Sequence, residues 1–203
     1  MSKVIGIVAI IMASALVLLS MSAIFMQFMF SMPEKMANKT VCFLAPDLTW
    51  SSKMSAVTKS FGKPIKSNVY DDITGTKENI YETKFENRKM EVRAERNTFP
   101  YPTNVFDYVF YIQCVDADDS QKVFDECFNQ IMKDNSNEPG FTYETVNLDE
   151  DAIMLDDIGN EVEVTEISND EIWFSINYGA TGIHYSLSQT NDYRVILQAY
   201  CVA

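Results

Sequence analysis

The single histidine of the chain is where acid–base or nucleophilic chemistry would be sought first. His184 lies in the stretch 183–188, where apolar and polar residues alternate, which predicts a strand with His184, Ser186 and Ser188 on its polar face. A serine–histidine pair becomes a nucleophile only when an acid orients the imidazole and donors stabilise the oxyanion. The nucleophile motif G-x-S-x-G is missing from the sequence. We therefore predict no catalytic residue and no enzyme activity; an enzyme whose site has no sequence signature is the alternative.

Three groups of acidic residues are candidates for binding a cation. The first group, 116–119, precedes a helical pattern, and helix capping accounts for it. The other two groups supply a weak candidate cation site formed by Asp149, Asp151, Asp156 and Asp157. Calcium requires several oxygen ligands from a tight loop, and the stretch 156–161 does not follow the EF-hand spacing. We predict no resident metal and no cofactor.

The chain has four cysteines: Cys42, Cys114, Cys127 and Cys201. An even number confined to one part of a chain fits an oxidising compartment. Cys114 could pair with Cys127, and Cys42 with Cys201 across the two ends of the domain. The alternative is four small buried hydrophobic residues without any disulfide. A zinc site is not expected, because the sequence has no C-x-x-C pair and one histidine.

An apolar segment precedes all of these residues. Residues 4–30 carry no formal charge, and about 20 apolar residues suffice to span a bilayer as a helix. We predict a single-pass signal-anchor over residues 1–31, followed by a juxtamembrane linker over 32–40. The alternative is a signal peptide cleaved after Ala23, although its apolar region would be unusually long. The charges that flank the apolar segment are nearly balanced and do not decide its orientation. The short stretch before the segment, the large domain after it and the cysteines confined to that domain favour a cytoplasmic N-terminus and an extracytoplasmic domain.

Composition limits the kinds of partner that the remaining residues, 41–203, could bind. The chain has a net charge of −13, and all 29 acidic residues follow the apolar segment. Such a field repels phosphate backbones, so we predict no binding to nucleic acid. Apolar residues make up 47% of the chain, which is enough for one packed domain.

The hydrophobic pattern predicts an α+β domain with two helices packed on a mainly antiparallel sheet that ends in a β-meander. We expect the helices at 49–61, beginning at Thr49, and at 116–133. The first strands are expected at 41–44, 68–73, 80–85, 89–96 and 105–115, the last of these covered on both faces. The later strands are expected at 141–148, 162–167, 172–178, 183–187 and 193–201.

The order of patterns within residues 49–96 is a helix, the turn Phe61-Gly62-Lys63-Pro64, and a hairpin. It resembles the helix-plus-strands module of the β-lactamase-inhibitory-protein and outer-membrane assembly lipoprotein group. That resemblance implies a small extracytoplasmic domain that binds other proteins, and it implies no particular functional residue. The chain departs from the group in lacking a lipobox cysteine and in its long C-terminal meander.

These patterns predict a membrane-tethered extracytoplasmic module that binds or assembles with another protein and has no catalytic activity. Its expected partners are the lipid bilayer, through residues 4–30, and a second protein. The alternative is a structural single-pass subunit of a larger membrane complex, with the anchor helix as its packing surface.

Overall fold

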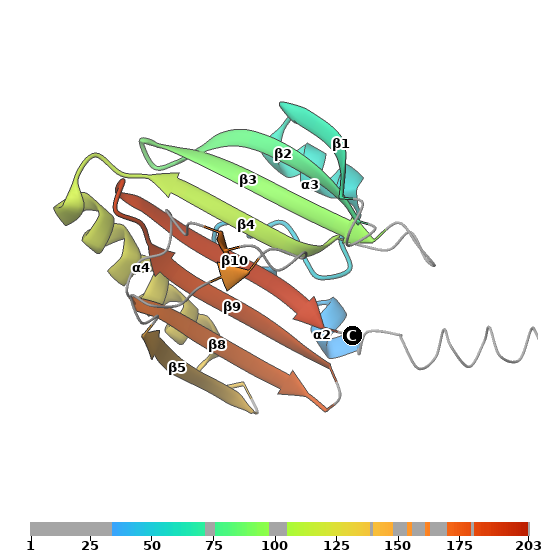
Figure 1. Ribbon diagram of the computed structural model, residues 1–203. Helices are drawn as coiled ribbons and strands as arrows, with labels where there is room; N and C mark the ends of the chain where they lie inside the picture. The colour runs from blue at the N-terminus through green and yellow to red at the C-terminus, as the bar shows by residue number, and fades with distance from the viewer. Residues whose placement is uncertain are drawn as a thin grey trace, which may run out of the picture.

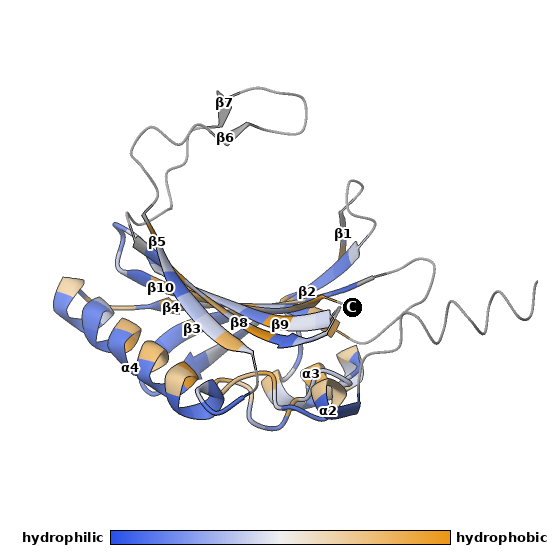
Figure 2. Cartoon of the chain, turned by 90° about the horizontal axis from the view of Figure 1, so that it is seen from below, coloured by the Kyte–Doolittle hydropathy of each residue, from blue (hydrophilic) through white to orange (hydrophobic). Residues whose placement is uncertain are grey.

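The computed structural model describes residues 34–71, 76–97, 105–138, 140–147, 154–155, 161–162, 170–179 and 181–202. Within them the protein is an α+β fold whose eight-stranded antiparallel sheet has its helices on one face (Figures 1 and 2). The helices are α2 (Glu34–Ala37), α3 (Met54–Phe61) and α4 (Ala117–Asn135). The strands of the sheet are β1 (Lys66–Asp71), β2 (Thr76–Phe85), β3 (Arg88–Asn97), β4 (Val105–Gln113), β5 (Phe141–Asn147), β8 (Asp170–Tyr178), β9 (Thr181–Gln189) and β10 (Arg194–Val202). A separate antiparallel pair consists of β6 (Met154–Leu155) and β7 (Glu161–Val162).

The sheet is built from two halves with the same order of elements. Its strand order is β1-β2-β3-β4-β10-β9-β8-β5. In the first half α3 is followed by the meander β1 to β4, and in the second α4 is followed by β5, β8, β9 and β10. The halves join where the last strand of each, β4 and β10, pair along seven residues from Arg194↔Gln113 to Tyr200↔Asp107.

The core lies between the sheet and the helices. Phe110, Leu197 and Leu187 come from three neighbouring strands and are fully buried. From α4, Val123, Cys127 and Ile131 point toward them at the spacing of one helical face. Amphipathic elements that bury one face against each other give this two-layer architecture.

Several predictions about local structure are confirmed. The hairpin β2–β3 turns at Glu86, whose φ of 51° is the left-handed conformation that tight turns use. Helix α4 begins after Asp116, whose side chain accepts a hydrogen bond from the backbone N–H of Asp119. Gly62 ends α3 with a φ of 86°. Strands β8, β9 and β10 form the expected C-terminal meander.

The predicted strand at 41–44 is wrong. These residues lie in a series of turns. The N–H of Ala45 donates a hydrogen bond to the carbonyl oxygen of Cys42, and the N–H of Leu48 donates one to the carbonyl oxygen of Ala45. The apolar run reflects burial rather than strand pairing, because Val41 and Leu48 are packed into the core beneath the sheet.

The first helix begins later than predicted. Helix α3 starts at Met54, whereas the backbone N–H of Thr49 bonds the hydroxyl of Ser52 at 2.9 Å. Serine and threonine hydroxyls commonly hold such non-helical turns. Trp50 therefore lies in a loop, where it is fully buried and meets the ring of Tyr108 edge-on at 5.9 Å.

Other expected boundaries shift as well. Strand β4 is central, as predicted, but helices cover it on one face only, and its residues alternate between buried and half-buried. The strand expected at 68–73 is β1, displaced by two residues. Of the strand expected at 162–167, the structure describes residue 162 alone, which belongs to β7.

The packed domain includes residues 34–40, which we predicted as linker. Met36 in α2 is fully buried. The ammonium groups of Lys35 and Lys39 each lie 3.0 Å from the carboxylate of Glu138. The proposed anchor, 4–30, lies outside the described residues, and none of the described helices is long and apolar enough to cross a membrane.

All four cysteines are buried and carry free thiols in the structure. Burial raises the pKa of Cys42, Cys127 and Cys201 to about 12. Because the thiolate is the reactive form, we expect these thiols to react slowly in the folded protein at neutral pH.

We predict that N-ethylmaleimide at pH 7 labels the native full chain slowly and labels all four cysteines after unfolding in urea. Mass spectrometry without reductant counts the labelled cysteines per chain in the native and in the unfolded protein. An unfolded chain that takes up no label would instead establish the two disulfides that the sequence suggested.

Candidate functional site

The face of the sheet opposite the helices is the candidate functional site, and we call it the open face. In Figure 2 the sheet curves so that α2, α3 and α4 lie on its convex side and the open face is concave. Residues paired across neighbouring strands project to the same side of a sheet. The side chains that alternate with the buried core residues therefore lie on the open face.

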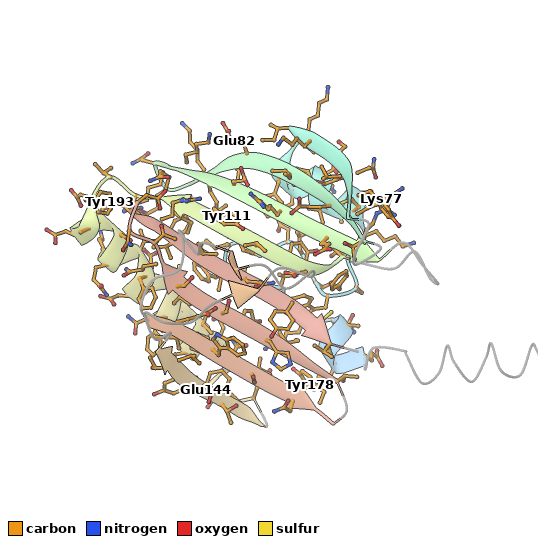
Figure 3. All side chains as sticks on the ribbon, viewed as in Figure 1. Lys77, Glu82, Tyr111, Glu144, Tyr178 and Tyr193 are labelled. Atoms are coloured by element: carbon orange, nitrogen blue, oxygen red, sulfur yellow. The ribbon has the colours of Figure 1, made fainter. Side chains whose placement is uncertain are left out.

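Two rows of side chains cross the open face. The first row, from β2 to β8, is Glu78, Glu95, Asp107, Tyr200, His184 and Ser175. The second row, from β3 to β5, is Arg93, Val109, Gln198, Ser186, Trp173 and Glu144. Figure 3 looks onto this face, with Glu144 at its β5 side, Tyr111 near its middle and Glu82 toward the opposite side.

Three acids stand side by side in the first row. Glu78 pairs with Glu95, and Glu95 pairs with Asp107. Like charges directly opposite each other destabilise a sheet. The pKa of Glu78 is raised, first by burial and further by Glu95, while Arg93 opposes the shift. One carboxylate oxygen of Glu95 accepts a hydrogen bond from the hydroxyl of Thr76.

Asp107 is the most perturbed of these acids. Burial, followed by the charges of Glu95 and Glu78, raises its pKa to about 6. A hydrogen bond from Gln198 and the nearby backbone N–H of Tyr108 work against this shift in pKa. That bond joins Nε2 of Gln198 to Oδ2 at 2.8 Å. The other oxygen, Oδ1, is buried and has no hydrogen-bond partner among the described residues. A buried carboxylate oxygen without a donor costs free energy.

Asp107 lines a hollow of about 560 Å³ that extends from β4 across β10 and β9 to β8. Small Ser186 lies between the larger Gln198 and Trp173 in the second row, which leaves space above it. Glu171 lines the same hollow from β8, and Tyr200 lines it from β10. We call this hollow, which Phe106 and Trp173 also line, the β9 hollow.

The other side of the open face is a network of ion pairs. The Arg93 side chain bonds Glu91 at 2.8 Å and lies over the ring of Tyr111 at 4.8 Å. Lys89 pairs with Glu82 at 2.7 Å. Exposed pairs of this kind contribute little to stability.

His184 contacts a different serine from the two that share its strand face. Its Nδ1 lies 3.0 Å from the hydroxyl of Ser175 on β8, and its ring stacks on Tyr200 at 5.1 Å. Burial lowers the pKa of His184, so the imidazole is neutral at pH 7. No described carboxylate bonds its Nε2, and the part of the chain that the structure describes assembles no triad around it.

Within the described ranges, no group of three or more His, Cys, Asp or Glu side chains is arranged to hold a metal ion. The predicted weak cation site of Asp149, Asp151, Asp156 and Asp157 lies outside those ranges.

A second hollow of about 340 Å³ lies between the C-terminal end of α4 and the loop 39–46. It contains Asn135, which is 3% exposed and whose Oδ1 has no described partner. Its lining includes one carboxylate, Asp134, whereas two carboxylates line the β9 hollow.

A scan against protein-family models, a search of curated proteins and a search of solved structures each returned no match to this chain. The site is therefore interpreted from its own residues.

Sequence reasoning missed the residues of the β9 hollow. One signal was present: Trp173 falls on the polar side of the alternation in 172–178, where a large aromatic residue is unexpected. Asp107 was a second signal, because it interrupts an otherwise apolar strand. Their proximity follows from the β4–β10 pairing, which joins residues distant in sequence.

We predict that Asp107→Asn stabilises the fold at pH 8 and has little effect at pH 4. The pKa of about 6 in the folded protein exceeds the ordinary value of about 3.9, so the native state binds the proton more tightly. The contribution of wild-type Asp107 to stability is therefore present at low pH and is lost as pH rises through 6. We expect a gain of about 1–2 kcal/mol in the free energy of unfolding at pH 8.

Urea unfolding of both variants across this pH range measures the effect. Glu144→Gln is the matched control, because Glu144 is an exposed acid on the same face whose cross-strand partner is Trp173. Equal stabilisation by both variants, or a loss of stability for Asp107→Asn at pH 8, would contradict the prediction.

Proposed function

We propose that this chain is a membrane-tethered, non-catalytic module that binds a protein partner through the open face of its sheet. The observation that supports this function best is a concave face spanning the whole sheet, with every described helix on the other side (Figure 2). A sheet normally buries one face against its helices and leaves the other in water. The chemistry of that second face then decides what the protein binds.

The side chains of the open face are those that favour protein interfaces. Trp173 is 44% exposed and Val202 is 48% exposed. Trp, Tyr and Arg are enriched among the residues that dominate binding energy, and Trp173, Tyr111 and Arg93 all lie on this face. The net charge of −13 favours a partner with a basic surface, since complementary potentials speed association and reject wrong partners.

The proposed tether places this face at a membrane surface. We propose residues 4–30 as a single-pass anchor with a cytoplasmic N-terminus and an extracytoplasmic domain. The first described element after it, α2, lies on the helix side of the sheet (Figure 2), so the chain enters the domain away from the open face.

The resemblance of residues 49–96 to the β-lactamase-inhibitory-protein and outer-membrane assembly lipoprotein group points to the same kind of function. We propose that it reflects a shared helix-plus-strands module. The order of α3 followed by β1, β2 and β3 is compatible with this, and an analogous order of α4 followed by strands recurs in the second half.

Site-specific photocrosslinking in cells tests the binding face. A benzophenone amino acid replacing Trp173 or Tyr111 is expected to yield discrete protein adducts, because both positions lie on the open face. The same amino acid replacing Asn129 or Lys133, on the exposed side of α4, is expected to yield none. In addition, Trp173→Ala is expected to reduce the adduct from position 111 by about tenfold, as the loss of an interface anchor would.

Adducts that form equally from both sides of the molecule would refute the open face as the binding surface. Adducts confined to α4 would favour the alternative of a structural subunit packed into a larger complex.

Protease treatment of intact cells tests the proposed orientation. An added protease is expected to degrade the domain while the cell envelope is intact, with a cytoplasmic protein as the protected control. A domain that is cleaved only after permeabilisation would place it on the cytoplasmic side.

A further inference from the structure

We propose that the β9 hollow binds a cationic side chain, arginine or lysine, presented by the protein partner. This inference rests on the proposed function, and it specifies the chemistry that the partner must bring to the open face. It draws on three features of the hollow: its two carboxylates, the rings of Trp173 and Tyr200, and one buried oxygen of Asp107 that has no donor in the described structure.

The two carboxylates flank the hollow from different strands. Asp107 is on β4 and Glu171 is on β8, with β10 and β9 between them. Tyr200 lines the same hollow from β10, and its pKa is raised by burial and by the charges of both carboxylates. A cation entering beside Tyr200 would therefore be attracted from both sides.

The aromatic rings provide a second form of attraction. Cations bind over the faces of tryptophan and tyrosine rings, and tryptophan is the strongest of these partners. Elsewhere in this protein, such faces are already occupied: Arg93 lies over Tyr111 at 4.8 Å, and Lys35 lies over Tyr178 at 5.7 Å. In the described part of the chain, no cation lies over Trp173 or Tyr200, although the neutral imidazole of His184 stacks on the Tyr200 ring at 5.1 Å.

The third feature is the Oδ1 atom of Asp107, which is buried and lacks a hydrogen-bond donor in the described structure. The charged neighbours that most strongly perturb Asp107 are two further acids, Glu95 and Glu78. This arrangement costs stability in the free protein, and an incoming N–H donor with positive charge would satisfy the oxygen and offset the repulsion.

The shape and chemistry of the hollow favour an organic cation over a bare metal ion. Its walls include the indole of Trp173 and the phenol of Tyr200, which suit a flat guanidinium or a methylene chain. The described acids are not grouped in threes as a metal ion would require.

Small probes test the hollow without knowledge of the partner. The full chain in a neutral detergent is titrated with Nα-acetylarginine amide, Nα-acetyllysine amide and the uncharged isostere Nα-acetylcitrulline amide. The indole N–H signal of Trp173 in a nitrogen-15 NMR spectrum reports binding, and that of the buried Trp50 serves as an internal control. We expect both cationic probes to bind at least about tenfold more tightly than the citrulline probe.

Two variants distinguish the carboxylates from general surface charge. Asp107→Asn and Glu171→Gln are each expected to weaken binding of the arginine probe about fivefold or more. Glu82→Gln removes the same charge from the far side of the same face, on β2 and outside the residues that line the hollow, and is expected to leave the affinity unchanged. Citrulline binding as tightly as arginine, or equal losses in all three variants, would overturn the inference.

The probe titration and the photocrosslinking experiment fail independently. Crosslinks from the open face without selective binding of the cationic probes would leave the protein-binding role standing and overturn the assignment of the hollow. Selective probe binding without open-face crosslinks would support the cation chemistry and overturn a protein as its source.

Discussion

The pairing of β4 with β10 is the constraint on which the rest of the structure depends. Each half of the domain contributes one principal helix and four strands, and in the described part of the sheet the halves meet along these two strands. At their junction, large residues face smaller ones, such as Tyr108 opposite Ala199. The buried ring of Trp50 packs edge-on against Tyr108, so the loop beneath the sheet supports the junction. A second link is the Arg88 side chain, which bonds Asp119 at the start of α4.

The two joined halves form one wide sheet, and the described helices cover only one of its faces. The open face is therefore available for recognition. The described helices are too few to cover both sides of eight strands, and all of them lie on the convex side (Figure 2). The acids of the first row then stand opposite one another at some expense to stability. Perturbed ionisable groups cluster at functional sites, where burial and neighbouring like charges shift their pKa values.

The features that were predictable from sequence depend on local patterns. The hairpin β2–β3, helix α4 and the final meander follow from periodicity, caps and turns within short windows. Even the Ser175–His184 contact follows once the turn at Gly179 fixes the register of β8 and β9. The apolar run 41–44 was misassigned because burial beneath a sheet and pairing within a sheet leave the same hydrophobic signal.

The β9 hollow was beyond sequence reasoning because its parts meet through long-range pairing. Asp107 reaches Tyr200 through the junction of the halves, and Trp173 reaches Ser186 through a hairpin of the second half. The hollow therefore exists only when both halves are folded and joined. A partner that binds there would stabilise the joined state in proportion to its occupancy, since a ligand specific for the native state shifts the folding equilibrium. Binding at the open face and integrity of the β4–β10 junction are thus thermodynamically linked, because these two strands supply Asp107, Gln198 and Tyr200 to the hollow.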